Sequence, residues 1–195
     1  MNLTNKRRAK MRGWVLVMLA LGGCSGPMAP SMAIRSEDRR DYDTAIGHDG
    51  RSSKEAFLRW RADLTGISFE EALIADVHLR KNPFDEDDGA AVSLGAVIYN
   101  ANCRSCHGSD AEGDGLYALS DHPPKDFRSF GARLQVAFSG GAPSEWFDKV
   151  RNGEGSTVQY SEGESRAMPA FAEKLSNEQI WLVLNYLASS DREAD

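Results

Sequence analysis

The chain of 195 residues lacks several features on which common architectures depend. No segment shows the alternation of apolar and polar residues that is typical of strands, and no segment repeats. The apolar run Trp14 to Leu21 has only eight residues. As a helix it would rise about 12 Å, well short of a bilayer core. The sequence therefore predicts an all-α fold, and this run is no membrane-spanning helix.

Cysteine and histidine are scarce. The chain has three cysteines and four histidines, namely Cys24, Cys103, Cys106, His48, His78, His107 and His122. A zinc site needs about four ligands, and no second Cys or His pair accompanies Cys103 and Cys106. A thioredoxin-like redox pair would need a βαβ context, and no such context is visible. The sequence therefore argues against a zinc site and against a thioredoxin-like pair at Cys103 and Cys106.

The two close cysteines belong to the pentapeptide Cys103-Arg104-Ser105-Cys106-His107. Two thiols three positions apart, followed at once by a histidine, form the pattern for covalent haem attachment. Each thiol can add to one vinyl group of the porphyrin, and the adjacent His107 can then ligate the iron as its proximal ligand. The sequence holds one such motif and predicts one covalent haem c.

Basic residues are outnumbered, with 23 Lys and Arg against 29 Asp and Glu. Residues 1–23 hold five of the basic residues and no acidic one, so the remaining chain is more acidic than the formal charge of −6. This balance excludes nucleic acid as a partner and favours a redox protein with a basic docking patch. The alternative is that the acidity serves only solubility.

The first residues predict export. Lys6, Arg7, Arg8, Lys10 and Arg12 form a basic region ahead of the apolar run. Leu21-Gly22-Gly23-Cys24 then resembles a bacterial lipobox, in which Cys24 becomes the lipidated first residue. Ser25 resembles the pattern of lipoproteins sent to the outer membrane. We expect a signal peptide over 1–23 and a periplasmic protein with a lipid anchor, although ordinary cleavage after Ser31-Met32-Ala33 is the alternative.

The rest of the chain divides into three parts. Residues 24–51 are rich in Ser, Gly, Pro and alternating charge, which predicts a flexible tether. Residues 52–81 predict a helical hairpin interrupted at Gly66, with capping boxes at Ser52 with Glu55 and at Ser68 with Glu71. Its apolar stripes are Phe57, Trp60 and Leu64, then Phe69, Leu73 and Val77. We expect these stripes to pack against the main domain over 82–195, the alternative being a partner-binding arm.

Further helices are predicted inside that domain. The acidic run Asp85 to Asp88 precedes a helix from about Gly89 to Asn102 and suits its N-terminus. Ser176 and Gln179 form a capping box, and Ile180, Val183, Leu184 and Leu187 follow at helical spacing.

With these elements the chain resembles a class I cytochrome c domain over about residues 88–190. The matching residues are Gly95, Tyr99, Cys103, Cys106, His107, Gly108, Gly113-Asp114-Gly115, Pro123-Pro124-Lys125-Asp126-Phe127, Met168-Pro169-Ala170-Phe171, Trp181 and Tyr186. The resemblance implies a small all-α fold around one haem, with the first and last helices crossing near Gly95, Tyr99 and Tyr186. It also implies that a carbonyl of Pro123 or Pro124 accepts a hydrogen bond from the second ring nitrogen of His107.

One methionine suits the second axial position. The others, Met1, Met11, Met18, Met28 and Met32, lie in the signal or the tether. Met168 alone stands inside the domain, before Pro169 and ahead of the last helix, where it resembles the family's distal ligand. Its soft thioether stabilises ferrous iron. The rival ligand is His122, fifteen residues after His107, which we expect on a surface loop.

An iron with two protein ligands is closed to substrate, so the sequence predicts an electron carrier and no enzyme. One alternative is the haem c subunit of a larger membrane-associated oxidoreductase, with residues 52–81 as its docking element. Another is a haem enzyme or gas sensor, which would need an open iron position. A two-haem peroxidase would need a second attachment motif, which the chain lacks.

Overall fold

The computed structural model describes residues 53–85, 88–118, 123–154 and 168–189. The predicted signal (1–23), Cys24, the predicted tether (24–51) and the rival ligand His122 lie outside these ranges. The helices of the described part are α2 (Lys54–Thr65), α3 (Phe69–His78), α4 (Gly89–Asn102), α5 (Arg104–His107), α6 (Phe130–Ser139), α7 (Ser144–Asn152) and α8 (Asn177–Ala188). Within these ranges the β-structure is a single isolated bridge, between Glu154 and Met168, so the predicted all-α class is confirmed.

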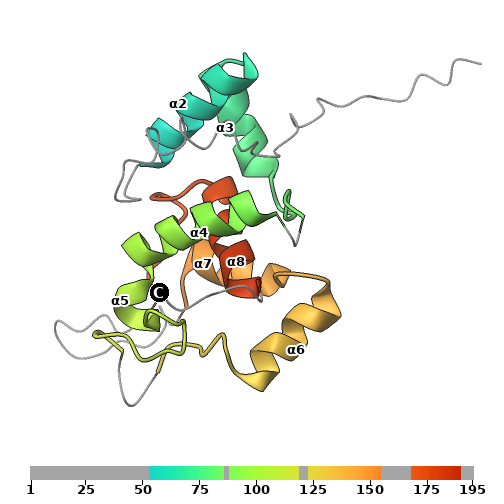
Figure 1. The fold of residues 1–195 in the computed structure, drawn as a ribbon. Coiled ribbons are helices and arrows are strands. Elements are labelled where there is room, and N and C mark those ends of the chain that lie inside the picture. The colour runs from blue at the N-terminus through green and yellow to red at the C-terminus, as the bar shows by residue number, and fades with distance from the viewer. Residues whose placement is uncertain (1–52, 86–87, 119–122, 155–167, 190–195) are drawn as a thin grey trace, which may run out of the picture.

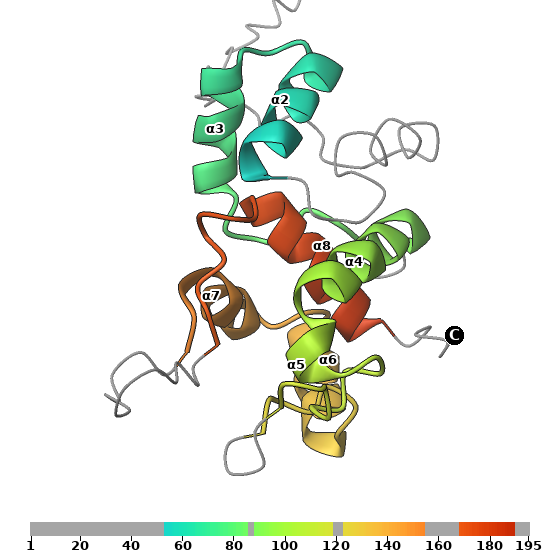
Figure 2. The ribbon, with the colours of Figure 1, turned by 90° about the vertical axis from the view of Figure 1, so that its left-hand side faces the viewer.

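Helices α4 and α8 cross at the centre of the molecule (Figures 1 and 2). The α2–α3 hairpin lies at one end of this crossed pair, and α6 lies at the other end. Helix α5 follows α4 directly, with Cys103 as the only residue between them.

The crossing of α4 and α8 depends on a missing side chain. A Cβ atom built on Gly95 would overlap the carbonyl oxygen of Leu182. Beside this point the rings of Tyr99 and Tyr186 lie 5.2 Å apart. Only glycine permits so close an approach of two helix backbones, and the predicted crossing near these residues is confirmed.

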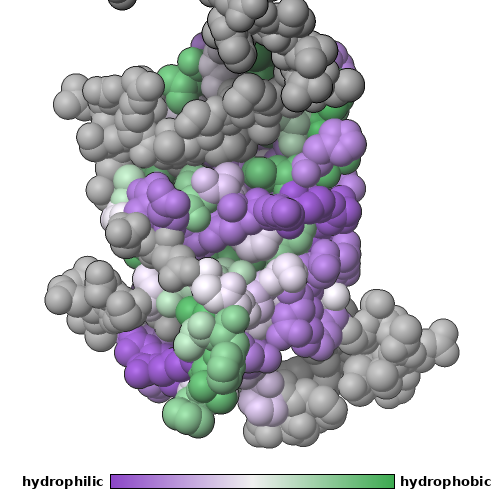
Figure 3. All heavy atoms as spheres, turned by 90° about the vertical axis from the view of Figure 1, so that its right-hand side faces the viewer, coloured by the Kyte–Doolittle hydropathy of each residue, from purple (hydrophilic) through white to green (hydrophobic). Residues whose placement is uncertain are grey.

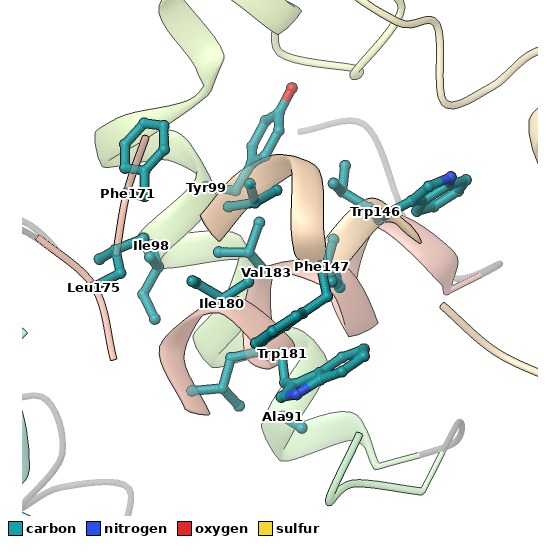
Figure 4. Close-up of a cluster of buried hydrophobic side chains, with 14 of the residues drawn as sticks. Ala91, Ile98, Tyr99, Trp146, Phe147, Phe171, Leu175, Ile180, Trp181 and Val183 are labelled. Carbon is teal, nitrogen blue, oxygen red and sulfur yellow. The ribbon is translucent and has the colours of Figure 1, made fainter. Parts of the chain in front are cut away.

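Large aromatic and aliphatic side chains from several helices form one buried cluster that includes α8 (Figure 4). Trp181 of α8 stacks on Phe147 of α7, with ring centroids 4.6 Å apart and planes 15° apart. Phe57 of α2 is fully buried and belongs to the same hydrophobic cluster. The hairpin therefore shares one core with the main domain, as we expected from its apolar stripes.

Side-chain caps begin most of the helices. The capping boxes at Ser68 with Glu71 and at Ser176 with Gln179 are both present. The predicted box at Ser52 is wrong by one residue, because Ser53 is the N-cap and accepts from the Ala56 N–H at 3.2 Å. Glu55 instead accepts two hydrogen bonds from Arg59, one turn further along α2.

The buried side of the hairpin differs from the predicted stripes. Phe57 is buried as expected, but Leu64 and Val77 are 39% and 48% exposed. Two charged residues, Arg61 and Asp76, are buried in their place. The reason is that the hairpin meets the polar N-terminus of α8, which supplies partners for charge.

Helix α6 presents an apolar side to solvent. Phe130, Leu134 and Phe138, which recur every four residues, are 81%, 41% and 83% exposed. Figure 3 shows apolar side chains gathered low on this face of the molecule, over α6. A pocket of about 650 Å³ lies between α6, the start of α7 and residues 80–82.

Candidate functional site

The two cysteines of the pentapeptide stand at the junction of α4 and α5. Cys103 ends α4, and its carbonyl accepts from the N–H groups of Cys106 and His107, at 3.1 and 2.9 Å. Both thiols are free and partly buried. Burial raises the pKa of the Cys103 thiol to about 12, so that this group is a neutral thiol at physiological pH.

The loop after His107 folds back over α5 and fixes it. The N–H groups of Gly113, Gly115 and Tyr117 donate to the carbonyls of His107, Cys106 and Ser105, at 2.9, 3.1 and 2.8 Å. A Cβ on Gly115 would lie within 2.6 Å of the Cys106 carbonyl, so only glycine fits there. These bonds hold the motif in one conformation.

The imidazole of His107 has one nitrogen engaged. Nδ1 lies 3.4 Å from the carbonyl oxygen of Lys125, and because a carbonyl only accepts, Nδ1 is the donor. Burial lowers the pKa of His107, which keeps the ring neutral. A neutral ring protonated at Nδ1 leaves the lone pair of Nε2 available to a metal.

The acceptor for Nδ1 differs from the expected one. We expected the carbonyl of Pro123 or Pro124, but the structure places the next carbonyl, that of Lys125, against the ring. The Pro124 carbonyl faces Gly113 instead, so closely that a Cβ on Gly113 would overlap it. Pro124 thus packs this segment against the Gly113 turn, and the hydrogen bond to His107 is made by the next residue, Lys125.

A row of aromatic rings continues the site from His107. The ring of Phe127 lies 5.4 Å from His107 and 4.9 Å from Trp146 of α7. Trp146 is buried, and its Nε1 has no hydrogen-bond partner among the described residues. A buried indole N–H without an acceptor among the described residues, separated from the predicted proximal histidine by one ring, fits a polar group of a bound cofactor.

Met168 lies beyond the far end of α7. Its carbonyl accepts from the N–H of Glu154 at 3.1 Å, and its partly buried side chain packs against the hydrophobic core. A Cβ on Gly153 would lie 2.7 Å from the Met168 carbonyl, so the two segments are in close contact. Helix α7 therefore carries Trp146, near His107, at one end and holds the Met168 segment at the other.

These residues fit a covalently held haem. Two free thiols directly precede a histidine with an available Nε2. The indole N–H of Trp146 on α7 has no partner among the described residues, and the thioether of Met168 stands in the segment held against the end of α7. None of the described residues forms a cluster of three or more Cys, His, Asp or Glu suited to a bare metal ion. The pocket beside α6 is lined by none of Cys103, Cys106, His107 and Met168.

Sequence reasoning did not single out Lys125 or Trp146 as site residues. The Lys125 carbonyl carries no side-chain signal, so only the path of the chain reveals it. For Trp146 the sequence does hold a signal: Trp146, Phe147 and Val150 recur at helical spacing, and they form the buried face of α7.

Comparison with known proteins assigns the chain to a family. A family model described as "Cytochrome C oxidase, cbb3-type, subunit III" matches residues 90–187. Cytochrome c550 of Pseudomonas aeruginosa is 29% identical over 118 residues, which cover 58% of this chain and 65% of that relative. No solved structure matches the chain.

Proposed function

Since the chain belongs to the cytochrome c family whose model is described as cytochrome c oxidase, cbb3-type, subunit III, we propose that it carries electrons one at a time through a single haem c. In this proposal Cys103 and Cys106 hold the haem, and His107 and Met168 are the axial ligands. The match to cytochrome c550 spans less than two thirds of that relative, so its name supports the proposal without deciding this chain's partners.

The observation that carries the proposal is the state of His107. Its Nδ1 is tied to the Lys125 carbonyl, and this contact orients the ring and selects the tautomer. The bonds between the 113–117 loop and α5 hold Cys106 and His107 in a fixed relation. These bonds fix the residues of the motif relative to one another, which suits electron transfer with little reorganisation.

When bound, the haem would supply reversible one-electron chemistry between ferric and ferrous iron. The chain's own residues would shape the surroundings of the haem. Phe127, Trp146 and Phe171 are buried and exclude water from the site, while the unpaired Nε1 of Trp146 offers a hydrogen bond to a polar edge of the group. With both axial positions occupied, no substrate would be transformed.

We also propose that Cys24 carries a lipid anchor in the periplasm, at the outer membrane. This rests on the sequence Leu21-Gly22-Gly23-Cys24, which lies outside the described residues. Among the described residues no helix is long and apolar enough to cross a membrane. The excess of Asp and Glu suits a redox partner with a basic docking patch.

The ligand assignment is tested by replacing the thioether. Met168→Ala should abolish the charge-transfer band between sulfur and ferric iron and lower the reduction potential, because the soft donor that favours ferrous iron is lost. A redox-titrated optical spectrum of the intact protein measures both effects. Met32→Ala and His122→Ala serve as controls and should leave the band unchanged. A band that survives in Met168→Ala would refute Met168 as ligand.

A second candidate is a cytochrome subunit of a larger oxidoreductase. One observation favours it: the hairpin exposes the large apolar side chains Leu64, Ile74 and Val77, at 39%, 57% and 48%. Replacing Ile74 and Val77 by Ser should then release the protein from a complex in detergent-solubilised membranes, measured by native gel migration. Wild-type protein that migrates as a monomer would exclude this candidate.

A further inference from the structure

The inner side of the α2–α3 hairpin is charged where it meets the main domain. Arg61 and Asp76 are 5% and 3% exposed, and Lys54 is partly buried. Arg61 Nε donates to the buried Glu178 Oε2 at 3.0 Å. Buried charges are costly unless they are paired, so these side chains define a specific contact between the hairpin and the start of α8.

Asp76 caps α8 from outside that helix. Its Oδ1 accepts from the N–H of Asn177 at 2.7 Å, and its carbonyl accepts from Asn177 Nδ2 at 2.7 Å. A carboxylate at a helix N-terminus satisfies unpaired N–H groups and complements the helix dipole. These two bonds fix the position of the hairpin relative to Asn177, the first residue of α8.

Lys54, the first residue of α2, extends this contact to the chain ahead of α8. Its Nζ donates to the Ala172 carbonyl at 3.1 Å and lies 3.7 Å from Asp76 Oδ2. Its backbone N–H donates to the Lys174 carbonyl at 3.0 Å. One residue of the hairpin thus holds the segment that follows Met168 at two points.

The opposite side of the same segment is held by α7 and the residues after it. The N–H groups of Phe171 and Ala172 donate to the carbonyls of Val150 and Arg151, both at 3.1 Å. Ala172 is therefore bonded through its N–H to α7 and through its carbonyl to Lys54. Residues 168–172 lie outside any helix, so bonds of this kind fix the position of Met168.

We propose that Lys54 is a positioning residue for the axial ligand Met168, and that the α2–α3 hairpin acts as a clamp on the ligand-bearing segment. This inference rests on the proposed haem function. Detachment of a thioether ligand is easier when its backbone can move away, and the charge-assisted bond from Lys54 to the Ala172 carbonyl opposes movement of this segment. The hairpin, which lies outside the stretch matched by the family model, thereby slows ligand loss.

The test measures how fast an added ligand replaces the thioether. Imidazole is mixed with the ferric full-length protein, and loss of the sulfur-to-iron charge-transfer band is followed in time. Lys54→Met removes the cation while retaining a side chain of similar length. We expect displacement to be about tenfold faster, the scale of one charge-assisted hydrogen bond. Lys54→Arg should recover most of the wild-type rate.

Arg59→Met is the matched control. It removes one positive charge from the same helix, but Arg59 is exposed, and its contacts stay within the hairpin, to Glu55 and to the ring of Phe69, 4.4 Å away. Its displacement rate should equal that of the wild type. Hydrogen exchange of the backbone in residues 168–175 gives an independent readout, and it should be faster in Lys54→Met and unchanged in Arg59→Met.

The outcomes separate this inference from the proposed function. A wild-type protein without the charge-transfer band would overturn the Met168 assignment and the clamp with it. A wild-type protein with the band, and a Lys54→Met variant with unchanged displacement and exchange, would overturn the clamp alone. Equal acceleration in Lys54→Met and Arg59→Met would also overturn it, since the effect would then follow charge rather than contact.

Discussion

At the scale of single residues, the least expected feature is a carboxylate in the core. Glu178 is 1% exposed, and only its Oε2 is paired, to Arg61; Oε1 has no hydrogen-bond partner among the described residues. The pKa of Glu178 is raised to about 7, mainly because the carboxyl group is buried. The nearby Arg61 lowers this pKa and the negative charge of Asp76 raises it, and both effects are included in that value. The folded protein therefore retains a proton that the unfolded chain releases.

This residue predicts a pH-dependent stability. Between about pH 4.5, the ordinary pKa, and about pH 7, the folded state binds more protons at Glu178 than the unfolded state. Its contribution is complete below about pH 4.5 and is lost as pH rises through 7. Relative to Glu178→Gln, the wild-type free energy of unfolding should fall over this interval by on the order of 2 kcal/mol.

Urea denaturation of the haem-loaded protein at a series of pH values measures the difference. The raised pKa of Asp76 has the same sign, but it is present in both proteins and so largely cancels. Glu173→Gln, which changes an exposed carboxylate just before α8, should follow the wild-type curve. Parallel curves for wild type and Glu178→Gln would contradict the prediction.

At the scale of elements, the contact between α4 and α8 decides where everything else lies. Helix α4 leads directly into Cys103 and α5, and Tyr99 of α4 donates to the Gly108 carbonyl at 2.7 Å. The segment with Met168 leads into α8. The angle and distance between these two helices therefore set the spacing of the two proposed axial ligands.

Gly95→Ala should disturb this contact. The added methyl would overlap the Leu182 carbonyl, which is backbone and cannot rotate away. Overpacking of this kind costs about 1–3 kcal/mol, more than the gain of up to about 1 kcal/mol in helix propensity. We expect a lower free energy of unfolding and a weaker sulfur-to-iron band.

Gly89→Ala is the control in the same helix. A Cβ on Gly89 meets no atom within 4 Å, so this change should leave the protein as stable as the wild type or slightly more stable. Chemical denaturation of the three proteins measures the effect. If both variants lost stability equally, close packing at Gly95 would not be the cause.

At the scale of the whole molecule, the chain combines a helical domain with a proposed lipid anchor at Cys24 and the linker that follows it. Residues 24–51 separate Cys24 from α2 and are rich in Ser, Gly, Pro and charge. Such a linker would let an acidic carrier reach a basic partner while it remains near the membrane. The hairpin, at the start of the described residues, would then lie between this linker and the haem domain.

Cys24→Ser tests the anchor. The variant should move from the membrane fraction to the soluble periplasmic fraction, because the lipidated residue is lost while the rest of the leader stays. Cell fractionation and mass spectrometry of the mature N-terminus measure this. Ala33→Arg, which would block ordinary cleavage after Ala33, is the control and should stay at the membrane. The anchor would be refuted if Cys24→Ser stayed there too.

Much of the fold follows from local rules that the sequence states directly. Ser68 with Glu71 and Ser176 with Gln179 begin their helices as predicted, and Gly66 ends α2 in the left-handed region, at φ 70°. The pentapeptide Cys103 to His107 forms one turn of helix because its bonds run between near neighbours. Contacts within four residues are encoded by spacing alone, so they are readable without a structure.

Only the tertiary structure decided what these elements meet. The His107 acceptor is Lys125 because Pro124 faces Gly113. The bonds from Lys54 to Ala172 and from Arg61 to Glu178 join residues more than 100 positions apart. The sequence by itself determined the haem motif, the hairpin, α4 and α8. The burial of charge between distant segments, and with it the proposed clamp on Met168, arises only when the hairpin packs against α8, because the partners are far apart in the chain.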